Sequence, residues 1–212
     1  MAMTLDLKTW LGRSPLIAIL RGVGPDEVVA ITHALERHGV AIVEVPLNSP
    51  DPFDSIRLLV REFGDRLLIG AGTVMTEAQV DQLAAAGGQL VVTPHAAGAV
   101  VRAAKRHGMI ACPGIATPTE AFAMLEAGAD GLKLFPAEAS SPAVLRAIRA
   151  VLPPGTLTMP VGGMEPGNMQ PWLDAGAAGF GIGGSIFRPG DTPQIVGEKA
   201  ARLMAALPPR RQ

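Results

Sequence analysis

Short apolar runs recur along the chain at a nearly constant spacing. Each holds four to seven residues, and only two of the eight contain a charged side chain. Runs of this kind are typical of strands that are buried on both faces of a parallel sheet. The eight runs cover residues 16–20, 41–47, 67–71, 90–93, 109–112, 131–135, 157–161 and 178–182. Successive runs begin 19 to 26 residues apart, which excludes two-residue hairpins and leaves room for a helix between each pair.

The segments between the runs contain the boundaries of helices. A side chain that can cap a helix stands before a proline, which suits the first helical position, in Asp51-Pro52, Thr117-Pro118, Ser141-Pro142 and Thr192-Pro193. Glycines stand where helices are expected to end, at Gly39, Gly87, Gly108, Gly128 and Gly176. A leading helix is predicted over residues 5–12 and a frayed tail over 208–212. No linker or low-complexity stretch interrupts the chain, which predicts a single domain over residues 1–212.

Eight consecutive strand–helix units predict an α/β protein that closes into a (β/α)8 barrel, the TIM-barrel fold. The chain has 212 residues, fewer than the roughly 250 typical of this fold, so its loops are expected to be short. The alternative is an open, doubly wound sheet, which usually has fewer strands and a phosphate-binding loop after the first. Arg21-Gly22-Val23-Gly24 occupies that position and is only a weak match to a dinucleotide-binding fingerprint. The pattern favours the barrel.

Composition narrows the class of protein. Hydrophobic residues make up 48% of the chain and charged residues 17%, which predicts a compact core. The formal charge of −1 indicates neither a nucleic-acid nor an anionic-membrane partner. The single cysteine, Cys112, excludes an internal disulfide, and charged residues interrupt the first apolar stretch, which excludes a signal peptide. No uncharged apolar run reaches the roughly 18 residues of a membrane span. A cytoplasmic protein without a membrane partner is expected.

A lysine lies inside the sixth apolar run. Side chains alternate between the two faces of a strand, so Lys133 shares a face with Gly131 and Phe135 while the flanking leucines share the other. If both faces are buried, desolvation lowers the pKa of the ammonium group. A neutral lysine is a nucleophile towards carbonyl groups. The alternative is a lysine at a strand end that extends its ammonium group to solvent.

Other polar side chains are expected at the same end of the strands. Glu44 is the only charge in the second run, and a buried carboxylate is costly unless it has a function or an ion-pair partner. Arg21, Thr73 and Pro94 end the first, third and fourth strands. A lysine, a glutamate and an arginine at one end of a barrel suit an anionic keto substrate.

Paired glycines follow the last two strands. Gly162 and Gly163 end the seventh strand, and Gly183, Gly184 and Ser185 end the eighth. Barrels of this type often bind phosphate with these two loops and the amino end of a short extra helix, because backbone N–H groups approach an anion closely where no Cβ intervenes. Residues 185–187 are the candidate for that helix, with the Ser185 hydroxyl as a further donor. The alternative is that the glycines only turn the chain. These five residues are called the glycine cradle below.

A metal site is not expected. Asp and Glu do not cluster with His at the spacing of metal ligands. His95 follows the fourth strand and is interpreted as a loop histidine, and Cys112, with no adjacent base, is interpreted as a small buried apolar residue. Neither a metal nor an organic cofactor is predicted.

The sequence resembles the KDPG/KHG aldolase family over nearly its whole length. The similar segments occur in the family's order and are Glu44-Val45-Pro46-Leu47-Asn48-Ser49-Pro50, Gly70-Ala71-Gly72-Thr73-Val74, Lys133-Leu134-Phe135-Pro136, Val161-Gly162-Gly163 and Gly183-Gly184-Ser185. The resemblance implies a class I lyase, usually a homotrimer. Such an enzyme splits a six-carbon phosphorylated keto acid into pyruvate and glyceraldehyde 3-phosphate.

The resemblance also implies roles for individual residues. Lys133 matches the family's Schiff-base lysine and Glu44 its acid/base glutamate, while the glycine cradle matches the phosphate site. The positions around the pyruvate part are matched by Arg21, Thr73, Pro94 and Phe135.

Two positions bear on the choice of substrate. Gluconate-specific relatives carry an arginine shortly after the glutamate and a threonine before the paired glycines, where this chain has Asn48 and Val161. These residues favour the galactonate-derived epimer, with the gluconate-derived epimer or both as the alternative. Two further alternatives are another phosphate-binding barrel enzyme, an isomerase or epimerase, and a phosphometabolite-binding protein without turnover.

Overall fold

The computed structural model describes residues 6–207. The helices are α1 (Leu7–Arg13), α2 (Val28–Arg37), α3 (Pro52–Phe63), α4 (Glu77–Ala85), α5 (Gly98–Arg106), α6 (Pro118–Glu126), η1 (Ala137–Ala139, a 3-10 helix), α7 (Pro142–Val151), α8 (Met169–Asp174) and α9 (Pro193–Ala205). The strands are β1 (Leu16–Ile19), β2 (Ile42–Pro46), β3 (Leu68–Gly72), β4 (Leu90–Val92), β5 (Ile110–Cys112), β6 (Gly114–Ile115), β7 (Leu132–Leu134), β8 (Thr158–Pro160) and β9 (Phe180–Ile182). Each predicted run coincides with an observed strand to within two residues.

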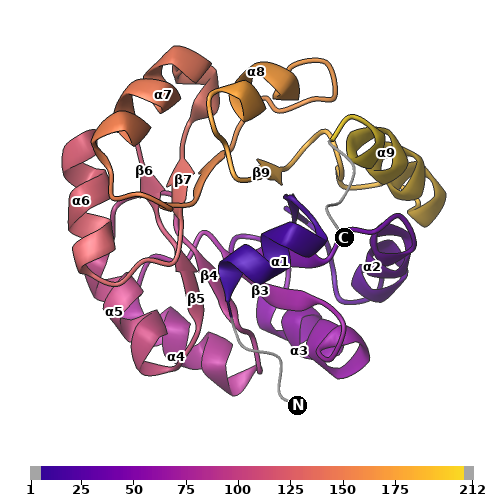
Figure 1. The fold of residues 1–212 in the computed structure, drawn as a ribbon. Helices are drawn as coiled ribbons and strands as arrows, with labels where there is room; N and C mark the ends of the chain where they lie inside the picture. Colours follow the sequence, from indigo (N-terminus) through magenta and orange to yellow (C-terminus); the bar gives the residue numbers. More distant parts are fainter. Residues whose placement is uncertain (1–5, 208–212) are drawn as a thin grey trace.

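The strands form two curled parallel sheets with helices on the outside (Figure 1). One sheet has six strands in the order β5-β4-β3-β2-β1-β9, and the other has three in the order β6-β7-β8. Every strand in both sheets is buried, which explains why their sequences are continuous apolar runs. Helix α1 lies across the amino ends of the strands, where Leu7 packs against Gly131 and Leu11 against Gly179.

The predicted closed eight-stranded barrel is found only in part. The fifth predicted strand continues as β6 beyond Pro113, and the chain there changes partner: Cys112 pairs with Val92 of β4, whereas Gly114 pairs with Lys133 of β7. Proline has no N–H to donate, so the ladder is interrupted at this residue. Between β8 and β9 the pairing is reduced to one isolated bridge, from Val161 to Gly181. The described chain is an α/β structure with two curled sheets.

The helix boundaries follow the predicted capping chemistry with one exception. The side chains of Thr117, Ser141 and Thr192 each accept a hydrogen bond from a backbone N–H of the helix that follows. Asp51 makes no such bond and has a left-handed backbone, with φ 38°. The glycines predicted to end helices all have positive φ and stand two residues after a helix: Gly39, Gly87, Gly108, Gly128 and Gly176.

The leading helix begins at Leu7, after Asp6, whose carboxylate accepts hydrogen bonds from the backbone N–H groups of Lys8 and Thr9. The predicted tail, residues 208–212, lies outside the described residues. Over residues 6–207, each helix is too short or too polar to cross a membrane.

Candidate active site

Lys133 lies at the centre of strand β7 and is buried. Only 7% of it is exposed, and its register partners on the two neighbouring strands are Gly114 and Met159. Its Nζ atom lies 4.5 Å from the centroid of the Phe135 ring. Burial lowers the pKa of the Lys133 ammonium group, the charge of Arg21 adds to this effect, and Glu44 opposes it. The arrangement favours a neutral amine.

Glu44 lies in the middle of β2, with 2% of its surface exposed. Desolvation raises the pKa of its carboxyl group from 4.5 to about 7, against the opposing charges of Lys133 and Arg21. Its Oε2 atom has no hydrogen-bond partner among the described residues. Since Glu44 and Lys133 shift each other's pKa, they lie within electrostatic reach of each other. A carboxyl group of this kind both accepts and returns a proton near neutral pH.

Two loops are joined beside this pair. The Nη1 atom of Arg21, which follows β1, donates a hydrogen bond of 2.6 Å to Oδ1 of Asn48, which follows β2. The backbone N–H of Gly22 donates to the buried Oγ atom of Ser49 at 2.9 Å. Asn48 therefore holds the Arg21 guanidinium group at the carboxyl ends of β1 and β2.

Thr73 and Pro94 follow β3 and β4, as predicted. Thr73 has a left-handed backbone with φ 55°, which is unusual for a β-branched residue. Unusual backbone conformations of this kind concentrate at functional sites. The Pro94 carbonyl group lies so close to Gly114 that a Cβ on Gly114 would be 2.7 Å from the oxygen. The fourth strand therefore packs tightly against the chain beside Lys133.

The glycine cradle contains two glycines with positive φ and lacks the expected short helix. Gly162 and Gly163 have φ values of 115° and 63°, which favour glycine. Residues 185–187 form no helix. Instead, the carbonyl oxygen of Gly183 accepts hydrogen bonds from the N–H groups of Ile186 (2.9 Å) and Phe187 (3.1 Å), which closes a single turn. Four residues are too few to align a helix dipole, so an anion here depends on individual N–H groups.

Two charged features near the glycine cradle were missed by sequence reasoning. The carboxylate of Glu138, an exposed residue of η1, lies over Gly162, where a Cβ would be 2.0 Å from its Oε2 atom. An anion at Gly162 therefore requires this side chain to turn away. Beyond the turn, a cavity of about 400 Å³ is lined by Gly184, Ser185, Arg188, Lys199 and Arg202 among others. Arg188 Nε donates to the Gly184 carbonyl oxygen at 3.0 Å, so a positive charge adjoins the turn.

Of the residues set aside on sequence grounds, Cys112 is buried within electrostatic reach of Lys133, whereas the histidines named next lie at the surface. His33 and His107 lie beside Glu62 and Asp81 at the surface, and His95 is exposed. Burial raises the pKa of the Cys112 thiol, which makes it a poor nucleophile. Within residues 6–207, no group of three His, Cys, Asp or Glu side chains is placed to hold a metal ion.

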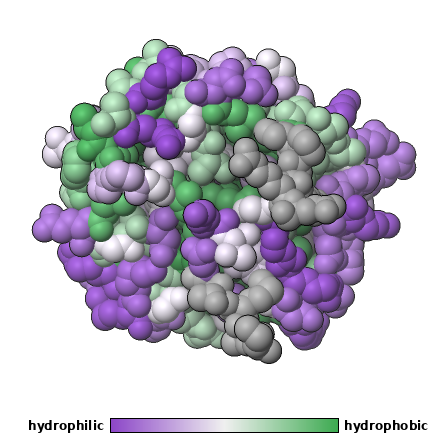
Figure 2. Space-filling view, viewed as in Figure 1, coloured by the Kyte–Doolittle hydropathy of each residue, from purple (hydrophilic) through white to green (hydrophobic). Residues whose placement is uncertain are grey.

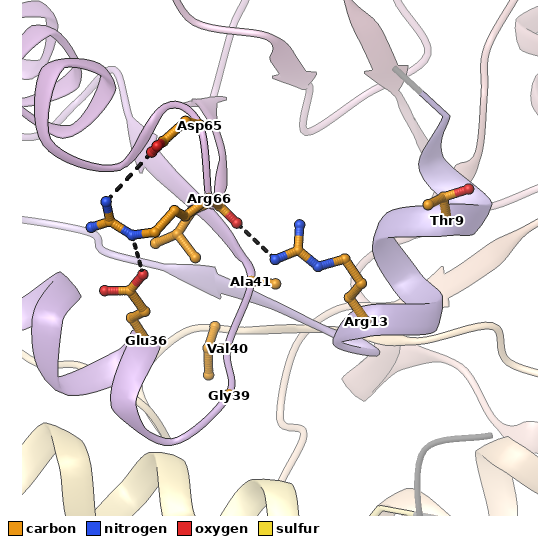
Figure 3. A pocket seen from close by; sticks show the side chains of 9 residues that line it. Thr9, Arg13, Glu36, Gly39, Val40, Ala41, Asp65 and Arg66 are labelled. Atoms are coloured by element: carbon orange, nitrogen blue, oxygen red, sulfur yellow. Dashed lines mark hydrogen bonds and ion pairs between the residues drawn. The ribbon is translucent and has the colours of Figure 1, made fainter. Parts of the chain in front are cut away.

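A second charged pocket lies at the opposite, amino end of the strands. It has a volume of about 410 Å³ and is lined by residues of α1, α2 and the segments before β2 and β3 (Figure 3). Arg66 Nε forms an ion pair of 2.7 Å with Glu36, and Arg13 donates to the Arg66 carbonyl oxygen at 2.9 Å. Arg66 pairs with Glu36 and Asp65, and all three side chains are at least partly exposed, so these charges provide no desolvated nucleophile or base.

Comparisons with known proteins show which family this chain resembles. The family model described as "KDPG and KHG aldolase" matches residues 7–202. The 2-dehydro-3-deoxy-6-phosphogalactonate aldolase of Escherichia coli K12 is 47% identical over 93% of this chain and 96% of its own. A solved structure described as "Native KDPGal structure" is 48% identical, with a TM-score of 0.89 over 91% of this chain and 93% of that one. The KDPG aldolase of Legionella pneumophila, solved with pyruvate as a covalent carbinolamine intermediate, is 26% identical, with a TM-score of 0.81 over 93% of this chain and 97% of that one.

Proposed function

The chain belongs to the KDPG and KHG aldolase family and is therefore a carbon–carbon lyase; from this premise we propose its substrate and mechanism. We propose that it is a class I aldolase that cleaves 2-dehydro-3-deoxy-6-phosphogalactonate to pyruvate and D-glyceraldehyde 3-phosphate, with Lys133 and Glu44 as catalytic residues. The observation that carries the proposal is the buried pair itself, a desolvated lysine beside a desolvated carboxylate at 7% and 2% exposure. The name of the Escherichia coli relative supports the choice of substrate.

Lys133 acts as the nucleophile in the first half of the reaction. Its neutral amine attacks the C2 ketone to give a carbinolamine, and loss of water gives an iminium ion that withdraws electrons from C3. The lowered pKa of Lys133 supplies the neutral amine, and the nearby charge of Arg21 contributes to that shift. The covalent carbinolamine of the Legionella pneumophila relative is a precedent for this step.

The second half belongs to Glu44. Its carboxylate removes the proton of the C4 hydroxyl group as the C3–C4 bond breaks, which releases the aldehyde phosphate and leaves an enamine on Lys133. Glu44 then returns a proton to C3, and water hydrolyses the resulting iminium ion to pyruvate and free Lys133. A pKa of about 7 suits a group that gives back the proton it has taken.

Substrate binding is assigned to the residues around this pair. Arg21, held by Asn48, binds the substrate carboxylate, and Thr73, Pro94 and Phe135 surround the pyruvate part. The glycine cradle binds the phosphate through its N–H groups and the Ser185 hydroxyl group. The position of Arg188 beside Gly184 supports an anion there.

The epimer preference is assigned to Val161. Val161 is 7% exposed and offers no hydrogen bond to a C4 hydroxyl group. The alternative substrate is 2-dehydro-3-deoxy-6-phosphogluconate, alone or together with the galactonate epimer, because the family description names KDPG first. No specific observation favours an isomerase, an epimerase or a binding protein without turnover.

The finer features of the fold and assembly are also proposals. Residues 1–212 form one domain whose two sheets act as a single (β/α)8 ring, supported by the direct passage of β5 into β6 and by the bridge from Val161 to Gly181. A cytoplasmic location and a place in galactonate degradation are proposed with the substrate. The lone cysteine, Cys112, buried as a free thiol, supports the first of these.

A homotrimer is proposed from the family resemblance and from exposed apolar side chains. Phe122 on α6 is 48% exposed, and Val144 and Val151 on α7 are 42% and 57% exposed. Figure 2 shows hydrophobic side chains gathered on that side of the molecule. Sedimentation equilibrium should give three times the mass of one chain, and a monomer at micromolar concentration would contradict the assembly.

Trapping with borohydride tests the reaction type. Borohydride reduces an imine to a stable secondary amine, so pyruvate and borohydride should add a permanent three-carbon adduct that mass mapping places on Lys133. An isomerase or a binding protein forms no imine and takes up no label. A matched control is Lys8→Met, which removes an exposed lysine of α1 at the opposite end of the strands. An unlabelled Lys133, or label that persists in Lys133→Met, would overturn the aldolase mechanism.

A further inference from the structure

We propose that Gly72 is a positioning residue for Glu44: the missing side chain at position 72 is the space that the Glu44 carboxylate occupies. The role of Glu44 as acid and base rests on the proposed function, whereas the contact itself rests on geometry alone. Gly72 is the last residue of β3.

The register of β2 and β3 explains the contact. Glu44 stands opposite Gly70, and Pro46 stands opposite Gly72, so Gly72 lies two residues closer to the carboxyl end on the same face as Gly70. A side chain leans along its strand as well as away from the sheet. The carboxylate of Glu44 thereby covers the Cα atom of Gly72.

Distances show how completely the space is used. A Cβ on Gly72 would lie 1.7 Å from Oε2, 2.3 Å from Cδ and 2.4 Å from Oε1 of Glu44. All three carboxylate atoms would lie closer to this Cβ than non-bonded atoms can approach. Any residue other than glycine at position 72 must therefore displace the carboxylate. The φ angle of Gly72 is not positive, so alanine meets no backbone strain there. The cost of the substitution falls on the Glu44 side chain, which is free to rotate, and the fold tolerates it.

The other glycine of this strand has a different role. A Cβ on Gly70 would lie 2.1 Å from the backbone oxygen of Leu90 and 2.7 Å from its carbonyl carbon. Backbone atoms of a neighbouring strand cannot rotate away, so a side chain on Gly70 would separate β3 from β4. Gly70 is required for packing of the sheet, and Gly72 for the place of the carboxylate.

Gly72→Ala in the full chain tests the proposal. We expect a folded protein whose cleavage rate falls by about 10- to 100-fold, part of the loss typical of a removed acid–base group, while pyruvate is still trapped on Lys133. Gly12→Ala is the matched control, because a Cβ on Gly12 meets nothing within 4 Å. Native activity in Gly72→Ala would overturn the proposal.

A double-mutant cycle separates displacement of the carboxylate from general damage. Glu44→Asp shortens the side chain by one methylene group and draws the carboxylate back from Gly72. Adding Gly72→Ala to Glu44→Asp should therefore cost less than about threefold, far below its cost in the native chain. An equal cost in both backgrounds would mean that Gly72 acts in another way and would overturn the proposal.

One readout does not depend on catalysis. Carbon-13 NMR of labelled glutamate carboxyl groups follows the titration of Glu44. In Gly72→Ala this titration should move to lower pH, because the displaced carboxylate leaves its desolvated position. In Gly12→Ala it should stay in place. If that titration moves although the native chain neither cleaves substrate nor forms an imine, the positioning role stands and the aldolase proposal fails. An unmoved titration overturns the positioning role whatever the activity.

Discussion

The two ends of the curled sheets both carry cations and carboxylates, but the surroundings of these charges differ. At the amino end, Arg66 pairs with Glu36 at 2.7 Å, and both side chains are partly exposed (Figure 3). At the carboxyl end, Lys133 and Glu44 are buried, and Oε2 of Glu44 has no hydrogen-bond partner among residues 6–207. At the carboxyl end, desolvation lowers the pKa of the Lys133 ammonium group and raises the pKa of the Glu44 carboxyl group to about 7.

The contrast between exposed and buried charges indicates that the carboxyl end is where the protein loses folding stability in favour of reactive groups. Exposed ion pairs are solvated whether or not they form, so they contribute little to stability. A buried, unpaired carboxylate disfavours the folded state and raises its own pKa by the same free energy. Substitutions at the carboxyl end should therefore change activity and stability strongly, whereas substitutions at the amino end should change both only slightly.

Glu44→Gln should have the largest effect. The amide keeps the shape of the side chain and loses the base, so cleavage should fall by about 10²–10⁴-fold, while trapping of pyruvate on Lys133 weakens less because water can assist dehydration. In the native protein the cleavage rate should rise with pH through about 7, as Glu44 ionises. Steady-state assays between pH 5 and 8 measure both effects, and near-normal cleavage would remove Glu44 from the mechanism.

The same substitution should stabilise the protein. The folded pKa of about 7 exceeds the ordinary 4.5, so the stability from proton binding is complete below pH 4.5 and lost as the pH rises through 7. Glutamine does not ionise, so the variant does not lose this stability at high pH. Its free energy of unfolding should exceed that of the native protein by up to about 3 kcal/mol at pH 8, and the difference should shrink towards pH 5. Urea unfolding at both pH values measures the gap, and one that is constant with pH would contradict the desolvation argument.

The strands were predictable because their burial is nearly complete. Strands covered on both faces have few polar positions, so each appears in the sequence as a mainly apolar run, and the helix ends follow from local capping chemistry. The division into two sheets was not predictable in the same way. Pro113 and the lone bridge from Val161 to Gly181 are properties of partners that meet in space. No periodicity along the chain records which strand a residue will pair with.

The residues of the candidate site also differ in whether the sequence predicts them. Lys133 and Glu44 were found because a charge inside an apolar run is conspicuous. Glu138 and Arg188 lie in polar loops where a charge is ordinary, and their importance depends on Gly162 and Gly184 being beside them. Residues 185–187, where a helix was expected, belong to a single turn in which Gly183 accepts hydrogen bonds from Ile186 and Phe187. The sequence alone identifies the buried charges, whereas the proposed anion site depends on neighbours in three dimensions.

Val161→Thr tests a smaller effect at the carboxyl end. Threonine has nearly the shape of valine and adds one hydroxyl group, which can bond to the C4 hydroxyl of one epimer. A single hydrogen bond contributes about 0.5–1.5 kcal/mol, or about two- to tenfold in kcat/KM. We expect the unaltered protein to prefer the galactonate-derived epimer, or to accept both, and the variant to shift towards the gluconate-derived one.

The control for this shift is Val151→Thr, which makes the same chemical change at a position on α7 that is 57% exposed. It should leave the ratio of the two kcat/KM values unmoved. A native protein that strongly prefers the gluconate-derived epimer, or a ratio that Val161→Thr does not change, would reduce Val161 to a packing residue.

Arg66→Gln should have the smallest effect, because it acts at the amino end. It removes the ion pair with Glu36 but keeps the backbone carbonyl group that accepts from Arg13. The pair is solvent-exposed, so Tm should change by no more than about 2 °C, and less at 1 M salt, where screening is strong. Cleavage should stay within about twofold of native, since such a change lies outside the site.

The control is Glu36→Gln, which removes the same ion pair from its other side. The double variant should be no less stable than the less stable of the two single variants. A tenfold loss of cleavage in Arg66→Gln would show that the charges at the amino end are coupled to Lys133 and Glu44. The proposed separation of the amino end from the reaction at the carboxyl end would then be wrong.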